Sequence, residues 1–301
     1  MNASLGRYCE LLEDPKTFLE CAQTPLARTI WANPLKGQIE RTALKIEAIG
    51  VDARPLSWRP GAWRLPPDVK PGHWLLFVTG EIHVQEEAAM LAGGLLGAKP
   101  GERILDLCAS PGGKTAQLAV SMTNRGTLIA NERARKRLSP LRRNLERLGV
   151  TCAAVSQFDG ARFPILEQPF DRILVDAPCT CEGTSRKQPG RIDRVDERFR
   201  ASIIQVQKAL LRRATALCKS GGTILYATCT YAPEENEGVL SAISPDVARI
   251  EPVVMPDGVR TAPGIPSWQG VRFRSDVRHA HRVWPHFNDT GGFFFAQLRK
   301  F

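Results

Sequence analysis

Strand and helix patterns alternate at short spacing from residue 103 onward, and this alternation constrains the fold more than any other feature of the sequence. Apolar runs of strand length end abruptly in polar residues, and the segments between them have helix-period apolar positions. This order is typical of a mostly parallel, doubly wound α/β sheet. The predicted strands are 103–108, 127–132, 152–158, 172–177, 223–228 and 293–298, and the predicted helices are 114–122, 135–149, 196–218 and 233–243.

Two features interrupt the regular alternation. Pro140 falls inside the predicted helix 135–149, and a proline there lacks a backbone donor and favours a break or a bend. The last strand, 293–298, follows an irregular stretch from Met255 to Asn288. Because this connection differs from the others, we expect the last strand to run antiparallel at an edge of the sheet.

The chain is predicted to form two domains, a small α/β unit over residues 1–71 and a larger one over 72–301. The stretch 57–72 is dense in Pro and Gly, so it is predicted as a turn-rich segment or linker. The small unit is expected to contain a helix within 5–23, a strand within 29–36 and an amphipathic helix over 39–50.

The net charge of +10 comes from residues 101–301, which hold thirty Lys and Arg against twenty Asp and Glu. Residues 1–100 hold eleven of each. A solvated helix face explains part of the basic cluster at 133–147, but the other clusters lie in loop-like sequence, where a polyanion such as RNA is the simpler explanation. The expected RNA surface consists of Arg186, Lys187, Arg191, Arg194, Arg278 and Arg282.

The cysteines and histidines do not predict a metal site. The eight cysteines include no C-x-x-C pair, so we expect reduced thiols without zinc. His279, His281 and His286 lack a recognisable fourth ligand, and an arginine-rich loop that carries histidines explains them better. No apolar run approaches the roughly 20 residues that span a bilayer, and the N-terminus lacks a signal pattern. We therefore expect a cytoplasmic protein with no membrane partner, as a monomer.

A glycine turn, ASPGGKT, follows the first strand of the alternating region and opens a helix. In this arrangement backbone N–H groups face a polar or anionic ligand. A nucleotide-triphosphate loop that ends at Gly113, Lys114 and Thr115 would need glycine at residue 108, which is Cys108. An NTPase could still use Asp176 as a magnesium ligand, so that alternative stays open.

Acidic residues at successive strand ends favour S-adenosylmethionine as the ligand of this turn. The cofactor has no phosphates, and its ribose hydroxyls need an acidic partner at the end of the next strand, where Glu132 stands. Asp159, after the third strand, could meet the adenine. One such residue is commonly a loop carboxylate, but Asp106, Glu132 and Asp159 occur in series.

Two cysteines, Cys179 and Cys229, lie just beyond the predicted carboxyl ends of strands, where open α/β sheets place their chemistry. A thiol there can act as a nucleophile, because a thiolate attacks carbon and its pKa responds to nearby charge. The alternative is that both are small buried hydrophobic residues.

The motifs DLCASPGGKT, ANE, FDGARF, VDAPC, ATCTYAPEENE and PHFNDTGGFFFA occur in this order, preceded by GEIHVQEEAAML. Together they resemble the Sun/Fmu (Nol/Nop/Sun) family of RNA 5-methylcytosine methyltransferases over residues 72–301. TIWANPLKG is similar to part of the family's small N-terminal RNA-binding unit. The resemblance implies a Rossmann-like class I S-adenosylmethionine-dependent methyltransferase sheet.

The resemblance also implies the roles of the site residues. Cys229 would be the nucleophile, and Cys179 would be the second cysteine that helps to release the product. The methyl donor would be bound by Cys108, Ala109, Ser110, Pro111, Gly112, Gly113, Lys114, Glu132, Asp159 and Asp176. From their positions and charges we expect Asp176 to hold the base and Lys114 either to lower a thiolate pKa or to support the turn.

The chemistry of cytosine independently calls for these residue types. C5 of cytosine becomes nucleophilic only after a thiolate adds at C6, and an acid/base group is needed for release. We expect ribosomal RNA as the substrate, with tRNA or DNA as alternatives; a DNA enzyme would use Cys179 as its nucleophile. A non-enzymatic RNA-binding protein is a third alternative, which the presence of both cysteines and the acidic residues disfavours.

Two departures from the family pattern affect these expectations. Cys181 stands where family members usually have a small residue, typically glycine, so the shape of the loop after Cys179 is open. The sequence ends at Phe301, without the further C-terminal RNA-binding domain of some relatives, and this leaves the choice of RNA open.

Overall fold

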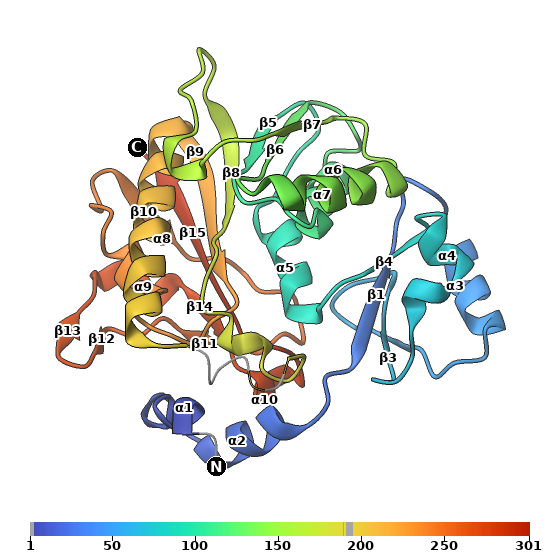
Figure 1. Ribbon diagram of the computed structural model, residues 1–301, viewed down its shortest axis with the longest axis horizontal. Coiled ribbons are helices and arrows are strands. Elements are labelled where there is room, and N and C mark those ends of the chain that lie inside the picture. The colour runs from blue at the N-terminus through green and yellow to red at the C-terminus, as the bar shows by residue number, and fades with distance from the viewer. Residues whose placement is uncertain (1–2, 189, 191–194) are drawn as a thin grey trace.

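The computed structural model describes residues 3–188, 190 and 195–301. A mixed α/β unit with a long twisted sheet occupies most of the molecule, and a smaller sheet with its own helices lies beside it (Figure 1). The large sheet is formed by β5 (Arg103–Asp106), β6 (Thr127–Asn131), β7 (Ala153–Ser156), β8 (Phe170–Asp176), β9 (Cys218–Thr228), β10 (Ala248–Glu251), β11 (Ala262–Pro263), β14 (His281–Val283) and β15 (Phe293–Lys300).

The order of these strands is β11, β14, β15, β9, β8, β5, β6, β7, with β10 also paired to β15. The strands from β9 to β7 are parallel to one another, as expected for a doubly wound sheet. In such a sheet the carboxyl ends of β5, β6, β8 and β9 meet at one edge. The predicted fold class is confirmed.

Helices cover both faces of the large sheet. Alternate residues of β8 point to opposite sides: Ile173 and Val175 join the core under α8 (Glu197–Leu217) and α9 (Glu237–Leu240), whereas Leu174 joins the core under α5 (Glu87–Leu95) and α6 (Gly113–Ser121). The helix α7 (Arg135–Arg147) packs Leu141 and Leu145 beside α6. Because both faces are covered, the central strands read as nearly continuous apolar runs.

Three local expectations are corrected. The helix α7 continues through Pro140, so the break that was one of the two outcomes expected there does not occur; the buried leucines on either side, Leu138 and Leu141, hold the helix against the core. The last strand, β15, is antiparallel as expected but lies inside the sheet, with β9 on one side and β14 and β10 on the other. The helix expected over 233–243 is confined to α9, since Asn236 before it has a non-helical backbone and hydrogen-bonds to Thr228.

The smaller unit is a four-stranded antiparallel sheet in the order β2 (Arg54–Pro55), β3 (Ala62–Leu65), β1 (Arg28–Ala32), β4 (Ile82–Val84), with α3 (Ile39–Ala48) and α4 (Leu75–Val78) packed on it. The stretch 57–72 is rich in turns, which is one of the two forms expected for it, but it is not a linker, because β3 lies within it and pairs with strands on both sides. The strand β4 follows residue 71 and pairs with β1. The domain boundary at residue 71 stays a prediction.

The first segment of the chain packs on the large unit and not on the small sheet. It comprises α1 (Ala3–Gly6), a 3-10 turn (Cys9–Leu11) and α2 (Pro15–Gln23), below the large unit in Figure 1. Tyr8 and Phe18 are fully buried, and Phe18 makes edge contacts with the rings of Tyr231 and Trp284. Asp14 caps α2 through the Thr17 backbone N–H (3.0 Å), so the single helix expected within 5–23 is divided.

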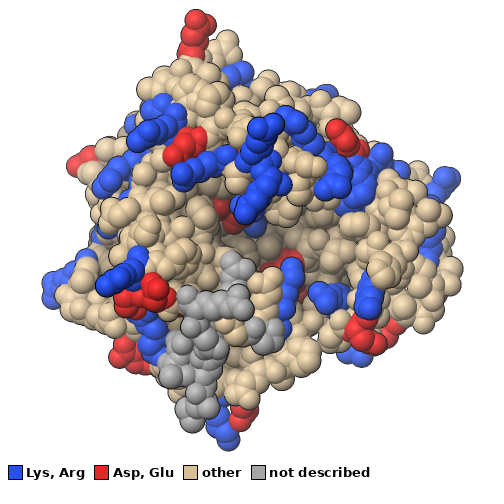
Figure 2. Space-filling view, in the orientation of Figure 1, with Lys and Arg blue, Asp and Glu red and all other residues tan. Residues whose placement is uncertain are grey.

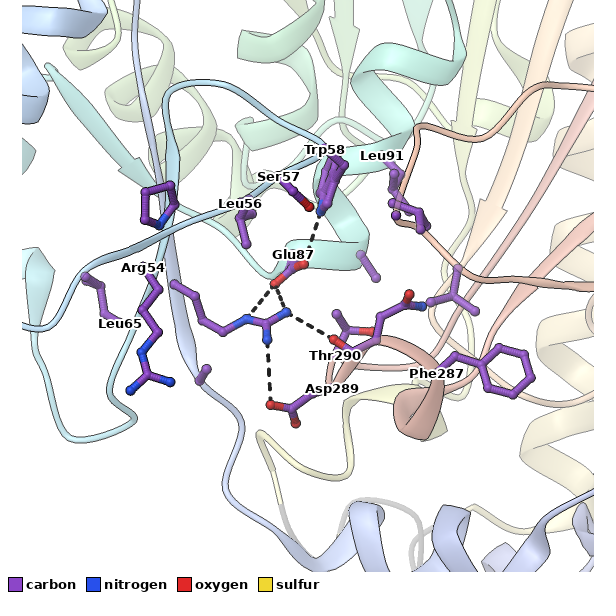
Figure 3. Close-up of a pocket in the computed structure, with 18 of the residues that line it drawn as sticks. Arg54, Leu56, Ser57, Trp58, Leu65, Glu87, Leu91, Phe287, Asp289 and Thr290 are labelled. Carbon is purple, nitrogen blue, oxygen red and sulfur yellow. Dashed lines mark hydrogen bonds and ion pairs between the residues drawn. The ribbon is translucent and has the colours of Figure 1, made fainter.

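A salt-bridge network joins the two units at the wall of a cavity of about 570 Å³ (Figure 3). Arg64 of β3 donates to Glu87 at the start of α5 (2.7 and 3.0 Å) and lies 3.8 Å from Asp289. The Trp58 indole also donates to Glu87 (3.1 Å). On the other side of the small unit, Arg147 of α7 donates to the Phe77 carbonyl (2.6 Å). These contacts fix the small unit beside the large sheet.

Among the described residues, no helix combines the length and the apolar composition that crossing a membrane requires.

Candidate active site

A cavity of about 720 Å³ lies at the carboxyl ends of the parallel strands. It corresponds to the central hollow of the space-filling view (Figure 2). The register brings the end of β5 beside β6 and the end of β8 beside β9. The predicted site residues that line the cavity are Cys108, Ser110, Pro111, Lys114, Glu132, Asp159, Asp176, Cys179 and Cys229, whereas Ala109, Gly112 and Gly113 lie behind this lining.

The glycine turn between β5 and α6 is held from behind by its neighbours. The Ala109 N–H donates to the Asn131 carbonyl (2.8 Å), and Arg137 of α7 donates to the Ser110 carbonyl (2.7 Å). Gly112 has φ +105°, a conformation that favours glycine, and a Cβ there would lie 3.1 Å from Leu141. The turn is therefore rigid and leads directly into the first turn of α6.

Two of the three acidic residues expected in series face the cavity. Glu132 follows β6 and accepts the Ala134 N–H (2.7 Å), and Asp159 accepts the Ala161 N–H (3.1 Å). Asp106 is different, because its carboxylate is buried below the turn and accepts a hydrogen bond from Thr115 (2.7 Å). Burial raises the pKa of Asp106 to about 7, so this residue supports the turn and does not present a charge to a ligand.

Lys114 and Asp176 form an ion pair that lines the cavity between the glycine turn and the cysteines. The Lys114 Nζ lies 2.7 Å from the Asp176 carboxylate, and it also lies over the ring of Phe293 at 5.2 Å from its centroid. Burial alone would lower the pKa of Lys114, but Asp176 outweighs burial and raises this pKa. Lys114 is therefore a fixed positive charge, and it interacts electrostatically with Cys229.

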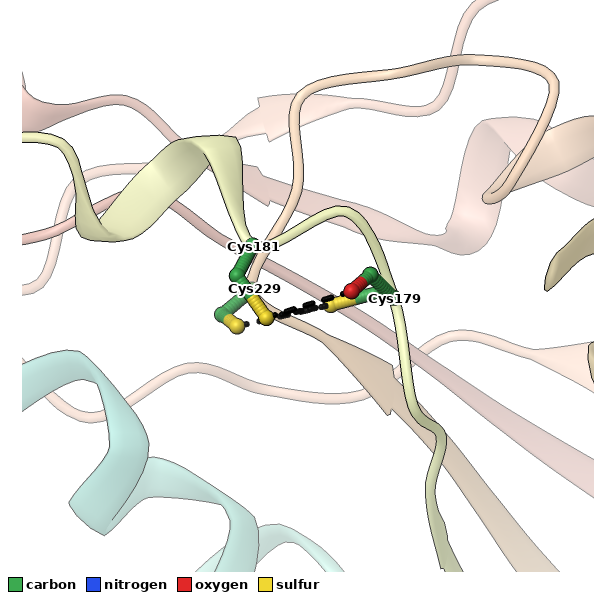
Figure 4. Close-up of side chains that lie close together, drawn as sticks. All are labelled: Cys179, Cys181 and Cys229. Atoms are coloured by element: carbon green, nitrogen blue, oxygen red, sulfur yellow. Dashed lines mark hydrogen bonds between the residues drawn. The ribbon is translucent and has the colours of Figure 1, made fainter. Parts of the chain in front are cut away.

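Three cysteines converge at the same edge (Figure 4). Cys229 directly follows β9, and Cys179 and Cys181 lie on the loop after β8. The Sγ atoms of Cys179 and Cys229 are 3.4 Å apart, and those of Cys179 and Cys181 are 3.7 Å apart. The two cysteines singled out from the sequence are thus in hydrogen-bonding contact although 50 positions separate them.

Hydrogen bonds and burial raise the pKa values of both the Cys179 and the Cys229 thiol. Hydrogen bonds with Cys181 and Cys229, together with burial, raise the pKa of Cys179. The hydrogen bond with Cys179 lowers the pKa of Cys229, but the bond with Cys181 and burial outweigh it, so the pKa of Cys229 also stays raised. Either sulfur can donate the hydrogen bond between Cys179 and Cys229. Both thiols therefore favour the protonated form in this site.

Close packing of glycines holds the two cysteine loops together. The Gly183 N–H donates to the Cys229 carbonyl (2.9 Å), and the Gly292 N–H donates to the Gly183 carbonyl (2.9 Å). A Cβ at Gly183 would overlap the Gly292 carbonyl oxygen. Only glycine fits at this crossing of the loops after β8 and β9 and the segment before β15.

A buried carboxylate, Glu182, fixes the first cysteine loop, and the sequence analysis did not single it out. It accepts the Tyr8 hydroxyl at 2.5 Å and the Thr230 hydroxyl at 2.7 Å. Arg200 of α8 neutralises it at 3.2 Å. The N-terminal segment is thereby connected to the residue that follows Cys181.

A second buried carboxylate, Glu235, was missed in the same way. It accepts the Thr180 N–H (3.0 Å) and hydroxyl (2.5 Å) and the Gln207 amide (2.8 Å). Burial raises the pKa of Glu235 to about 7. The run PEENE shortly after Cys229 could have indicated a buried carboxylate. Several glutamates in one loop of an apolar region need hydrogen-bonding partners if they are buried.

The expected RNA surface is corrected at two positions. Arg186 has a side chain only 2% exposed and is paired with Asp289 (2.7 Å), and Arg282 is buried against Glu237. Each of these arginines forms an ion pair inside the protein with an acidic residue that is distant in sequence, so its charge is used for structure and not for RNA. Lys187 and Arg278 are exposed, and Lys187 also lines the cavity. Arg191 and Arg194 lie outside the described residues.

The exposed basic residues nearest the cavity belong to α7 and the turn before it. Figure 2 shows Lys and Arg gathered along the rim of the central hollow, over the region of α7 in Figure 1. Arg133 and Arg137 line the cavity, and the exposed members of this group are Arg133, Arg135, Lys136, Arg137, Arg142 and Arg143. We name this group the α7 basic face. A solvated helix face was expected to explain part of this cluster, and its position at the rim suits a polyanion.

Comparisons with known proteins agree with the geometry of this edge. A family model described as 16S rRNA methyltransferase RsmB/F matches residues 93–299. The tRNA (cytosine(49)-C(5))-methyltransferase of Pyrococcus abyssi is 35% identical over 100% of this chain and 96% of its own length. Ribosomal RNA small subunit methyltransferase F of Erwinia tasmaniensis is 33% identical over 94% of this chain. The human 28S rRNA (cytosine(4447)-C(5))-methyltransferase is 34% identical over 99% of this chain.

The chain spans 59% and 37% of the lengths of these two ribosomal RNA enzymes. Among solved structures, a methyltransferase homologue from Pyrococcus horikoshii superposes with a TM-score of 0.83 at 28% identity over 100% of both chains. NSun6 from the same organism, solved with the S-adenosylmethionine analogue SFG, has a TM-score of 0.85 at 21% identity and covers 100% of this chain and 98% of its own. The second similarity concerns the fold alone.

These matches confirm the predicted family, the predicted cofactor S-adenosylmethionine and RNA cytosine-C5 methylation as the type of reaction, and they do not favour DNA as the substrate. The chain belongs to the RsmB/F family of S-adenosylmethionine-dependent RNA methyltransferases.

Proposed function

We propose that this chain methylates C5 of a cytosine in ribosomal RNA, with Cys229 as the nucleophile and Cys179 as the base that releases the product. The observation that carries the proposal is the Cys179–Cys229 contact of 3.4 Å inside the cavity that Lys114 and Asp176 also line. The description of the matching family and the ribosomal RNA relatives support this substrate class.

The residues of the cavity fit S-adenosylmethionine. Glu132, Asp159 and Asp176 present carboxylates, which suit a cofactor with a sulfonium and an ammonium group. Apolar side chains such as Leu107 and Phe293 complete the lining and suit the adenine and the methyl group. We assign Glu132 to the ribose hydroxyls and Asp159 to the adenine end, with the turn from Cys108 to Lys114 at the amino-acid end.

The first half of the reaction belongs to Cys229. Its thiolate, stabilised by the Cys179 hydrogen bond and by the charge of Lys114, forms a bond to C6, and the electrons of the C5–C6 double bond become available at C5. Asp176 accepts a hydrogen bond from the exocyclic amine and thereby orients the base. Bound S-adenosylmethionine supplies the electrophilic methyl group that C5 takes up.

The second half belongs to Cys179. After Cys179 has released its thiol proton to solvent in the open cavity, its sulfur removes the proton from C5, the C5–C6 double bond forms again, and the bond from Cys229 to C6 breaks. Cys229 leaves as a thiolate and accepts the Cys179 hydrogen bond again. Each cysteine therefore has a separate step, and the two steps predict opposite phenotypes.

The proposal is tested by the covalent adduct. We expect Cys229→Ala to form none, because the nucleophile is missing, and Cys179→Ala to accumulate a protein–RNA adduct that survives denaturing electrophoresis, because release is blocked. Cys152→Ala is a matched control, since Cys152 is half-buried and does not line the active-site cavity. Adduct accumulation in Cys229→Ala in place of Cys179→Ala would reverse the two roles.

A tRNA substrate is the second candidate, and one observation favours it. The Pyrococcus abyssi relative, named for tRNA, matches over nearly the whole length of both chains. Labelled methyl transfer to ribosomal RNA and to tRNA, each purified from cells that lack the enzyme, decides between them. Incorporation into tRNA alone would move the assignment to tRNA.

We further infer that the protein acts in the cytoplasm as a monomer. Light scattering of the purified chain should then give a mass near 33.2 kDa. A mass of twice this value at working concentration would contradict the monomer.

A further inference from the structure

The three sulfur atoms at the active site have the spacing of metal ligands. The Sγ of Cys179 lies 3.4 Å from that of Cys229 and 3.7 Å from that of Cys181, and all three lie within 4.8 Å of one another. Two thiolates bound tetrahedrally to one zinc ion at about 2.3 Å stand about 3.8 Å apart. In the part of the chain that the structure describes, this is the one group of His, Cys, Asp or Glu side chains with such spacing.

The backbone of Cys181 adds a second, independent observation. Cys181 has φ +59° and ψ +28°, the left-handed conformation, which is unfavourable for a residue with a side chain by roughly 1–2 kcal/mol. This conformation directs its sulfur back to within 3.2 Å of the Cys179 carbonyl oxygen. Glu182 holds the next residue in place through its bonds to Tyr8 and Arg200. A strained backbone held by buried partners is typical of functional positions.

The surroundings can accommodate a cation. All three cysteines line the cavity of about 720 Å³, so an ion can reach them, and the open side leaves a fourth ligand position for water. Lys114 interacts with Cys229 and favours its ionised form, whereas Asp176 balances the lysine charge at 2.7 Å. A divalent cation bound to three thiolates carries a net charge of −1.

We propose that Cys179, Cys181 and Cys229 together bind one soft divalent cation of the zinc class, and that this cation reversibly blocks methylation. Thiolate ligands select soft and borderline cations. A cation on these sulfur atoms would block two groups at once: the Cys229 thiolate, which attacks C6, and the Cys179 sulfur, which accepts the proton from C5. The inhibition rests on the proposed function of these two cysteines, but the binding does not.

The pH dependence of binding follows from the protonation of the thiols. A cysteine binds a metal ion as the thiolate, so the cation must displace the protons of the thiols. The apparent affinity should therefore fall as the pH is lowered, and calorimetry in buffers of different ionisation enthalpy should detect proton release.

The test compares the full chain with Cys181→Gly, which removes one ligand and suits the left-handed backbone. Binding of Zn²⁺ is measured by competition with a chromophoric chelator, in a phosphine reductant that keeps the thiols reduced, and Co²⁺ serves as the spectroscopic probe. We expect one ion per chain, thiolate-to-cobalt charge-transfer absorption, and a loss of affinity of at least about 100-fold in Cys181→Gly, since even outer partners of a bound metal are worth about 10–100-fold. Cys152→Ser is the matched control and should bind as the unaltered chain does.

Methylation is then measured with and without buffered Zn²⁺. We expect the unaltered chain to lose activity and to regain it with a chelator, and Cys181→Gly to keep most of its own zinc-free activity at the same Zn²⁺ concentration. Unchanged Zn²⁺ affinity in Cys181→Gly overturns the proposed site, as does a loss of activity that only a reductant reverses, which would indicate a disulfide. If the unaltered chain methylates no tested RNA, the proposed function fails, whereas the binding data still decide on the site.

Discussion

The contact between Tyr8 and Glu182 predicts that the N-terminal segment controls the catalytic loop. Tyr8→Phe removes only the hydroxyl, because the ring keeps its tilted contact with Tyr231 and its stacking on Trp268. The lost hydrogen bond is 2.5 Å long, buried and directed to a carboxylate. Bonds of this kind contribute about 1.5–3 kcal/mol, so the free energy of unfolding should fall by that amount.

The same change should slow the chemical step. Glu182 lies next to Cys181 and accepts a hydrogen bond from Thr230, which follows Cys229. If half of the lost energy serves to position this loop, the rate of adduct formation falls by about 3- to 12-fold. Single-turnover kinetics with enzyme in excess measure this rate, and urea unfolding measures the stability.

A matched variant on the same segment separates positioning from stability. Phe18→Leu weakens packing against Tyr231 and Trp284 by about 1–1.5 kcal/mol and touches no hydrogen bond of Glu182. We expect it to lower the stability with little change in the single-turnover rate. An equal loss of rate in Phe18→Leu, or an unchanged rate in Tyr8→Phe, would refute the coupling.

Three further predictions concern other parts of the molecule. The pKa of Asp106 is about 7 in the folded chain and 3.8 for the free group. The folded state therefore keeps a proton that the unfolded state loses, and the free energy of unfolding falls as the pH rises from about 4 to 7. Asp106→Asn removes this loss, so urea unfolding should show that it gains stability relative to the unaltered chain over the same pH range. Gly183→Ala should abolish adduct formation, because its Cβ overlaps a backbone carbonyl oxygen at the crossing of the catalytic loops. Neutralising Arg142 and Arg143 should flatten the salt dependence of RNA binding by about 0.7–0.9 for each lost phosphate contact, whereas Arg249→Ala on β10 should leave the slope unchanged.

The sequence predicts the central sheet and the chemical residues well, for a physical reason. Buried parallel strands are apolar runs with sharp polar ends, so their carboxyl ends can be located, and Cys179 and Cys229 can be expected to lie close together. Short strands between tight turns have no such signature. The strand β3 has four residues inside a Pro- and Gly-rich stretch, and its antiparallel partners, not its own composition, make it a strand.

The partners of charged residues were the main limit of prediction. Arg186 and Arg282 were expected to face RNA because loop arginines usually do, yet Asp289 and Glu237 bury them. These partners are 103 and 45 positions away, and nothing local in the sequence distinguishes a paired arginine from a free one. The convergence of three cysteines has the same kind of origin. C-x-x-C spacing is the local signal of a cysteine group, and this chain lacks it, whereas the fold brings Cys229 to the C-x-C pair of Cys179 and Cys181.

The interior position of β15 has a consequence for how the enzyme is made. This strand follows every other described strand in the chain, yet it separates β9 from β14 and β10, so β9 has an unpaired edge until β15 is synthesised. The Gly292 bond to Gly183 just before β15 also closes the catalytic loops. The catalytic loops are therefore closed only after β15 has been made and inserted, and until then β9 presents an open sheet edge of the kind that pairs with other chains.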